Sequence, residues 1–204
     1  MNIHFYKKNR ALTLTTTALF LSLGVIFPQL FHALGLGTAF SPMHLPVLLC
    51  GLMCGGLLGA IVGFVTPFIS SFIFTMPPLF PTALVMSLEL ATYGLLIGLL
   101  YRLFINKENV LLKKTATIFS LLIALVGGRI VYGIAMWFIV LAQGGVYSLT
   151  VYVTAVIINS WSGLVLQIIA IPLIMVVLEK NHTLLKYHST DVSNKTHNTE
   201  SIKS

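Results

Sequence analysis

The chain has 204 residues, of which 57% are hydrophobic and 8% are charged, and its mean hydropathy is +0.96. A soluble globular domain carries about 25% charged residues, so this composition excludes an ordinary soluble domain and favours a protein that lies in the bilayer. The net charge of +7 would suit a nucleic-acid-binding protein, but the basic residues cluster before the first apolar run, in one gap between runs and after the last run. We therefore predict an all-α integral membrane protein that does not bind nucleic acid.

The first apolar run covers residues 11–31 and follows three basic residues, Lys7, Lys8 and Arg10. Its start imitates a signal peptide, but no small-residue cleavage site with polar flanks follows it. We therefore interpret the run as a retained first membrane helix. Residues 1–10 are then a short cytoplasmic N-terminus.

A long apolar stretch covers residues 44–75. One straight helix of this length would measure about 48 Å, whereas a hydrocarbon core is about 30 Å thick. We predict two shorter, tightly joined helices, because the stretch contains five glycines that can supply a break and small surfaces for close packing. These glycines are Gly51, Gly55, Gly56, Gly59 and Gly63.

Three more apolar runs follow, at residues 81–103, 115–141 and 155–178. When the preceding stretch is counted as two spans, six transmembrane helices result, and every basic cluster falls on the same side, as the positive-inside rule requires. Both termini are then cytoplasmic. Residues 11–180 form one transmembrane domain, and the polar composition of residues 181–204 predicts a disordered cytoplasmic tail.

Cys50 and Cys54 lie four residues apart, which is typical of small residues on one helix face and differs from the CxxC spacing of redox and zinc sites. The histidines near the chain ends are scattered, as solvated residues are. We expect no disulfide, no metal and no cofactor. The sequence contains no GxxxxGK[ST] pattern, so we also expect that the chain does not itself hydrolyse ATP.

Glu89 and Arg129 lie deep inside apolar runs. A charge at the bilayer centre costs about 2.5–3.5 kcal/mol on insertion scales, so each must face the bundle interior or water. Counting 1.5 Å per residue from the outer helix ends puts Glu89 about 12 Å and Arg129 about 18 Å deep. The two residues can form an ion pair that fixes packing, or they can contact a ligand. Arg129 suits a carboxylate or phosphate, and Glu89 would orient Arg129 or accept ligand hydroxyl protons.

Two tyrosines extend the face on which these charges lie. Tyr93 follows the glutamate by one helical turn, and Tyr132 follows the arginine in the same way. Each phenol combines an apolar ring with a polar tip that can meet a ligand. The adjacent pair Gly127 and Gly128 would let another backbone or a ligand approach closely.

The last apolar run has its own polar group, in which Asn159 and Ser162 share one helix face and can reach a ligand. Trp161 between them is either an interfacial belt residue or a further contact. Gln167 lies deeper, where we expect it to bond a neighbouring helix.

The external segment at residues 74–81 contains three prolines and no charge. It is either a semi-rigid lid or a short connector stiffened by proline. Thr75 and Met76 in this segment, and His44 at the start of the second helix, complete the candidate substrate contacts.

Four stretches, in this order within a six-helix frame, resemble the substrate-specific S component of an energy-coupling factor (ECF) vitamin transporter. They are SPMHLPVLLCG at residues 41–51, GFVTPFISS at 63–71 with the following MPP at 76–78, MSLELATYG at 86–94, and SGLVLQ at 162–167 with IP at 171–172. The resemblance covers about residues 11–178, and it rests on the ordered set of motifs.

The resemblance implies that the transmembrane domain binds a vitamin or precursor in a cavity near the external face. It implies partners as well: one T-type membrane subunit and two ATPases, which together form the ECF module. In the family, small residues on the first helix, often as AxxxA, contact the T subunit. The nearest equivalents here are the pairs Ala11/Thr15 and Ala18/Ser22, which depart from that pattern.

Within the family, the motifs are most similar to those of the pantothenate-specific branch, so we expect a specificity subunit for pantothenate. S components for hydroxymethylpyrimidine, folate, cobalamin or niacin are the alternatives. An intramembrane enzyme using His44 and Glu89 is less favoured, because no HExxH, GxSxG or paired-carboxylate motif occurs. A stand-alone secondary transporter is also less favoured, because no inverted repeat is evident.

Overall fold

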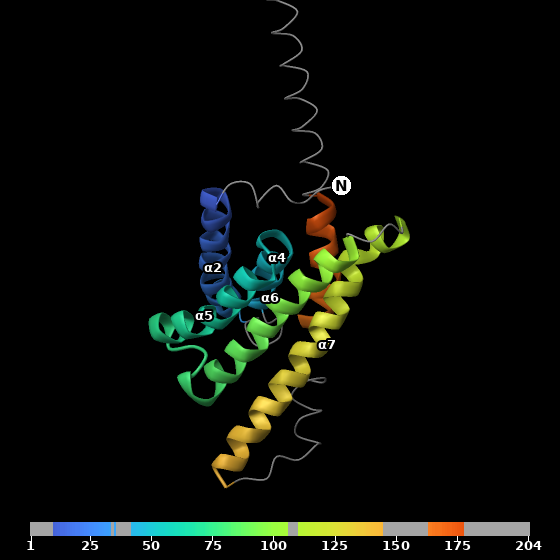
Figure 1. The fold of residues 1–204 in the computed structure, drawn as a ribbon. Helices are drawn as coiled ribbons and strands as arrows, with labels where there is room; N and C mark the ends of the chain where they lie inside the picture. The colour runs from blue at the N-terminus through green and yellow to red at the C-terminus, as the bar shows by residue number, and fades with distance from the viewer. Residues whose placement is uncertain (1–9, 34, 36–41, 106–109, 145–162, 178–204) are drawn as a thin grey trace, which may run out of the picture.

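The structure is a computed structural model that describes residues 10–33, 35, 42–105, 110–144 and 163–177. All regular structure in these residues is helical (Figure 1), which confirms the predicted all-α class. The elements are α2 (Arg10–Ala33), α4 (His44–Cys54), α5 (Gly56–Phe74), the short kinked turn η1 (Leu79–Ala83), α6 (Leu84–Ile105), α7 (Val110–Ala142) and a last helix, Gly163–Val177.

Four of the described segments are long and apolar enough to cross a bilayer: Arg10–Ala33, Gly56–Phe74, Leu79–Phe104 and Thr115–Ala142. The prediction of six spans is thus supported in part. The last predicted span, residues 155–178, lies partly outside the described residues, and the predicted tail, residues 181–204, lies wholly outside them. The described part of that span, Gly163–Val177, is a shorter apolar helix. The cytoplasmic location of both termini stays a prediction.

The two predicted helices in residues 44–75 are present, and Gly55 separates them. Gly55 has φ 101° and ψ 161°, a conformation that other residues rarely adopt. The break comes early, so α4 has 11 residues and reaches about 16 Å, roughly half of the hydrocarbon core. The expectation that this helix is a full span is not met, because its length is set by the position of Gly55.

Glycines on α4, α5 and α6 bring the three backbones together. A Cβ atom on Gly51 would lie 2.6 Å from the carbonyl oxygen of Gly94, and one on Gly59 would lie 2.6 Å from the Cα atom of Gly51. Gly98 approaches Gly56 equally closely. The predicted role in close packing is therefore confirmed for Gly51, Gly56, Gly59 and Gly63, where any larger residue would push the helices apart. A Cβ atom on Gly55 would meet nothing within 4 Å, so Gly55 supplies the break and no close contact.

Helix α6 is the central element of the described fold, with contacts to α4, α5, η1 and α7 (Figure 1). Its buried residues recur every three to four positions and include Leu90, Tyr93, Ile97 and Tyr101, as expected for a helix that packs on several neighbours. This burial pattern places Glu89 and Tyr93 inside the bundle.

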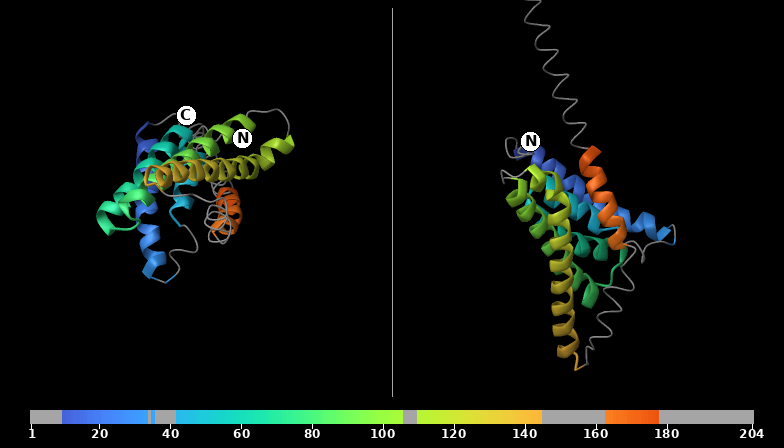
Figure 2. Two further views of the ribbon diagram at one scale, coloured as in Figure 1. Left: turned by 90° about the horizontal axis from the view of Figure 1, so that it is seen from below. Right: turned by 90° about the vertical axis from the view of Figure 1, so that its right-hand side faces the viewer.

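Helix α7 lies along α6, and its C-terminal end extends past the other described helices (Figure 2). One stripe of large apolar side chains on α7 is exposed: Ile118, Leu122, Val126, Ile130 and Ile134. In water such a stripe would be an aggregation surface, whereas in a bilayer it faces lipid. Arg129 does not belong to this stripe and points toward α6.

Candidate functional site

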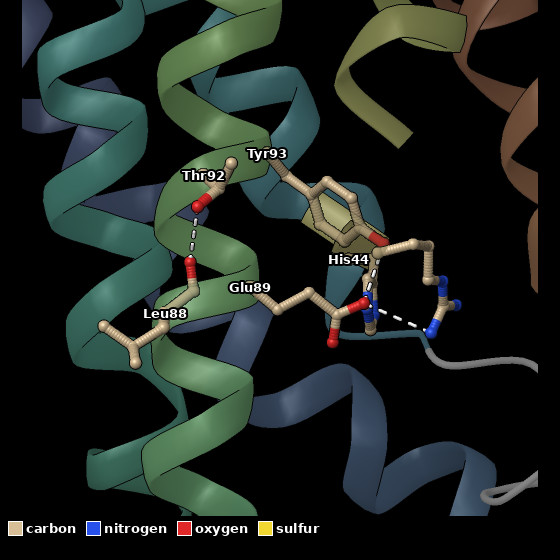
Figure 3. Close-up of polar contacts among 6 residues, drawn as sticks. His44, Leu88, Glu89, Thr92 and Tyr93 are labelled. Atoms are coloured by element: carbon tan, nitrogen blue, oxygen red, sulfur yellow. Dashed lines mark hydrogen bonds and ion pairs between the residues drawn. The ribbon is translucent and has the colours of Figure 1, made fainter. Parts of the chain in front are cut away.

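Three side chains from three helices converge on one carboxylate oxygen. The Nη1 atom of Arg129 on α7 lies 3.2 Å from Oε1 of Glu89 on α6. The phenol of Tyr93, also on α6, donates a hydrogen bond of 2.7 Å to the same oxygen. Nε2 of His44 on α4 lies 3.9 Å from it. Figure 3 shows Glu89 reaching from α6 toward His44 and Tyr93. We call these four residues the polar cluster.

The polar cluster is withdrawn from solvent. Glu89 and His44 are 2% exposed and Tyr93 is fully buried, while the Arg129 side chain keeps 13% exposure. A buried carboxylate is tolerated when it is paired and hydrogen-bonded. The arginine, as the most accessible member, is the one best placed to meet a molecule that enters from outside the cluster.

The sequence positions Glu89 and Tyr93 by simple helical spacing, because residues four apart on a helix are neighbours on its surface. The Tyr93 ring also stacks obliquely beside His44, with ring centroids 5.3 Å apart. His44 is the first residue of α4. The start of α4 is therefore anchored to the face of α6 that carries the carboxylate.

Gly128 controls how α7 approaches this face. A Cβ atom on Gly128 would lie 2.8 Å from Cζ of Tyr93 and nearer still to two other ring atoms. A Cβ atom on Gly127 would collide with the end of the Leu96 side chain. The space beside these glycines is thus filled by side chains of α6, which corrects the expectation that a ligand or another backbone approaches there. The missing Cβ of Gly128 lets Tyr93 lie against α7, with Arg129 next to Glu89.

The two carboxylate oxygens of Glu89 have different surroundings. Tyr93, Arg129 and His44 all make their closest approach to Oε1. In Figure 3 the second carboxylate oxygen points away from the Tyr93 and His44 side chains. A carboxylate accepts hydrogen bonds at both oxygens, so Glu89 can hold Arg129 with one oxygen and accept a proton donor with the other.

The other predicted contacts are placed less favourably. Tyr132 is half-buried on α7, one turn beyond Arg129. Thr75 and Met76 are exposed beyond the end of α5 and bond back to that helix: the Thr75 N–H to the Ser71 carbonyl, and the Ser70 hydroxyl to the Met76 carbonyl. No hydrogen bond or ion pair joins these two to the polar cluster in the part of the chain that the structure describes. Asn159, Trp161 and Ser162 lie outside it.

The predicted docking residues lie on one exposed face of α2. Ala11, Thr15, Ala18 and Ser22 are all exposed. The Thr15 hydroxyl donates to the Ala11 carbonyl at 3.0 Å, and the Ser22 hydroxyl donates to the Ala18 carbonyl at 2.9 Å. Both hydroxyls are thus bonded within α2, and the face that remains is small and largely apolar.

Gln167 is a buried polar residue that the predicted site left out. It is fully buried on the last helix, and neither atom of its amide has a hydrogen-bond partner among the described residues. The expected bond to a neighbouring helix is therefore absent from that part of the chain. The feature of the sequence that could have added Gln167 to the site is its polar side chain in an otherwise apolar helix. Among the described residues, no group of three or more metal-ligating side chains comes together.

These features define a helical, multi-pass membrane protein with a buried, charged cluster between its helices. The profile of the family described as ECF transporter, substrate-specific component, matches residues 12–175, from α2 to the last helix. The chain belongs to this family, whose members are substrate-specific subunits of ECF transporters. No curated protein and no solved structure matches the chain significantly.

Proposed function

We propose that the chain captures pantothenate at the polar cluster and delivers it to an ECF-type importer. The observation that carries this proposal is the buried ion pair between Arg129 and Glu89 in a member of the substrate-specific component family. Intramembrane ionisable residues are expensive, and by default they mark the path or site of a polar solute.

Arg129 would bind the ligand carboxylate. Its guanidinium is a planar fork of five N–H donors that matches a carboxylate in a bidentate manner, and Glu89 fixes the orientation of that fork from one side. Pantothenate also carries an amide and two hydroxyl groups. The second oxygen of Glu89 would accept a hydroxyl proton, and Tyr132, Asn159 and Ser162 would supply further hydrogen bonds.

The remaining predicted contacts would complete and close the site. His44 supports the carboxylate from α4. Thr75 and Met76, in the connection between α5 and α6, would move over the ligand as part of a lid, together with Trp161 from the outer end of the last span. Closing the site removes water and strengthens each polar contact inside it.

The partners would be one T-type membrane subunit and two ATPases. The exposed face of α2 that carries Ala11, Thr15, Ala18 and Ser22 is suited to docking on another membrane helix, because small residues let two backbones approach closely. The hydrogen bonds within α2 favour docking, because the Thr15 and Ser22 hydroxyls keep a hydrogen-bond partner when a second helix displaces water from this face.

The experiment is titration calorimetry of the purified chain with a panel of vitamins and precursors, without ATP. We expect tight binding of pantothenate and no uptake by vesicles that contain this chain alone. Tight binding of another member of the panel would replace pantothenate by that ligand. Silence across the whole panel, or uptake by the isolated chain, would contradict the proposal.

A further inference from the structure

The polar cluster has a net formal charge of zero when His44 is neutral. The candidate spans contain four strongly charged positions among the described residues, and two of these, Arg10 and Arg102, are exposed near helix ends. Glu89 and Arg129 remain inside, with 3.2 Å between Nη1 and Oε1. The positive charge that a bound anion would meet is therefore already offset by a carboxylate.

This offset makes the net charge of the ligand matter. In an interior of low dielectric, each additional unit of negative charge interacts with Glu89 as well as with Arg129. A single ligand carboxylate can gain bidentate hydrogen bonds from the guanidinium in return. With His44 neutral, a further negative charge on the same ligand finds no second cation in the described interior of the spans or in the polar cluster, so it adds repulsion and desolvation without a matching gain.

The Glu89 carboxylate is held in place beside Arg129. Its oxygen is held by the Tyr93 phenol at 2.7 Å, and the residue is 2% exposed. The adjacent backbone is fixed too, because Gly63 of α5 packs directly on the Leu90 carbonyl. The titratable groups that face this carboxylate are His44 from α4, Tyr93 from α6 and Arg129 from α7.

We propose that Glu89 is a specificity-determining residue that limits the negative charge of the ligand. Glu89 lets Arg129 bind a ligand with a single carboxylate. It disfavours the phosphate monoester of the same compound, because the phosphate adds up to two negative charges to that carboxylate. This inference rests on the proposed function, namely that the ligand is pantothenate and that it binds beside Arg129. It assigns the chain to capture of unphosphorylated precursors, which the cell must phosphorylate after uptake if it needs the ester.

The test compares three probes at one fixed pH: pantothenate, its phosphate monoester, and panthenol, the neutral alcohol that replaces the carboxylate. For wild type we expect the ester to bind at least about tenfold more weakly than pantothenate. Glu89→Gln keeps the shape of the side chain but removes its charge. In this variant the ratio of the dissociation constant of the ester to that of pantothenate should be at least about tenfold smaller than in wild type. The variant should also favour pantothenate over panthenol more than wild type does.

The bulk of the phosphate cancels in this comparison, because Gln and Glu have nearly the same shape. Glu89→Asp is the matched control: it retains the charge, so it should weaken both probes alike and leave their ratio as in wild type. An unchanged ratio in Glu89→Gln would show that the ester is excluded by size and would overturn the inference. Wild-type binding of the ester as tightly as pantothenate would overturn it whether or not the variant folds. If wild type binds none of the three probes, the proposed ligand fails, and this inference fails with it.

Discussion

The Nη1 atom of Arg129 lies 3.2 Å from Oε1 of Glu89, so the two intramembrane charges form an ion pair between α7 and α6. The pair fixes how the two helices meet, and it also presents a guanidinium whose side chain is 13% exposed beside a carboxylate that is almost fully buried. If the proposed function holds, stability and ligand binding both depend on this one contact, and separate variants can distinguish the two roles.

Removal of one member of the pair should destabilise the protein more than removal of both charges. Glu89→Gln or Arg129→Met alone leaves an uncompensated buried charge, which typically costs about 3–5 kcal/mol in the free energy of unfolding. The double variant should recover much of that loss. Denaturant unfolding of all four proteins in one detergent gives the coupling energy. Additive losses would mean that the ion pair contributes no energy of its own.

The hydroxyl of Tyr93 should stabilise the cluster measurably. Tyr93→Phe removes a hydrogen bond of 2.7 Å to a buried carboxylate, and hydrogen bonds to charged groups contribute about 1.5–3 kcal/mol. We expect a loss of unfolding free energy in that range. The control is Thr92→Val on the same helix, whose hydroxyl bonds to the Leu88 carbonyl on the other side of α6 (Figure 3). A loss for Tyr93→Phe no larger than the loss for Thr92→Val would contradict the prediction.

Gly128 should tolerate a side chain less well than Gly127. The Cβ of Gly128→Ala collides with the Tyr93 ring, which cannot bend away, whereas that of Gly127→Ala meets the flexible end of Leu96. Overpacking typically costs about 1–3 kcal/mol, so we expect a loss in this range for Gly128→Ala and a smaller one for Gly127→Ala. Thermal unfolding of the two variants in parallel provides the measurement, and the reverse order would show that Tyr93 does not lie against α7.

A large residue on the α2 face should block assembly without affecting ligand capture. Ala18→Trp places a bulky ring where two helices would have to approach closely, so co-purification with the T subunit and the ATPases should fall while binding by the isolated chain persists. Leu122→Trp, at an exposed position of α7, is the matched control and should assemble normally. Normal assembly of Ala18→Trp would move the docking surface away from this face.

The sequence allowed prediction of those features that depend on local chemistry. The helical break in residues 44–75 followed from the glycine cluster. The ion pair of Glu89 and Arg129, one of the two alternatives offered, was open to prediction because the constant rise of a helix put both residues at similar distances from the helix ends. The shortness of α4 could not be predicted, because several glycines could have ended that helix and it was Gly55 that adopted a positive φ.

The arrangement of side chains inside the polar cluster was harder to predict from the sequence. His44 was named as a candidate, but its approach to Glu89 depends on how α4 packs on α6, which spacing along one chain does not specify. The space beside Gly128 was assigned to a ligand or a backbone, whereas the Tyr93 ring fills it. In both cases the missing information is the rotation of one helix about its axis relative to its neighbour.

The central claim is that Arg129 binds the carboxylate of the ligand, and a comparison of two ligands tests it most directly. Calorimetry would measure pantothenate and panthenol against wild type, Arg129→Ala and the surface control Arg102→Ala, with folding checked by thermal unfolding. Wild type and Arg102→Ala should prefer pantothenate, and Arg129→Ala should lose that preference, because the interaction that distinguishes the carboxylate from the alcohol is gone. An undiminished preference for pantothenate in a folded Arg129→Ala variant would show that Arg129 serves only the packing of α7 on α6.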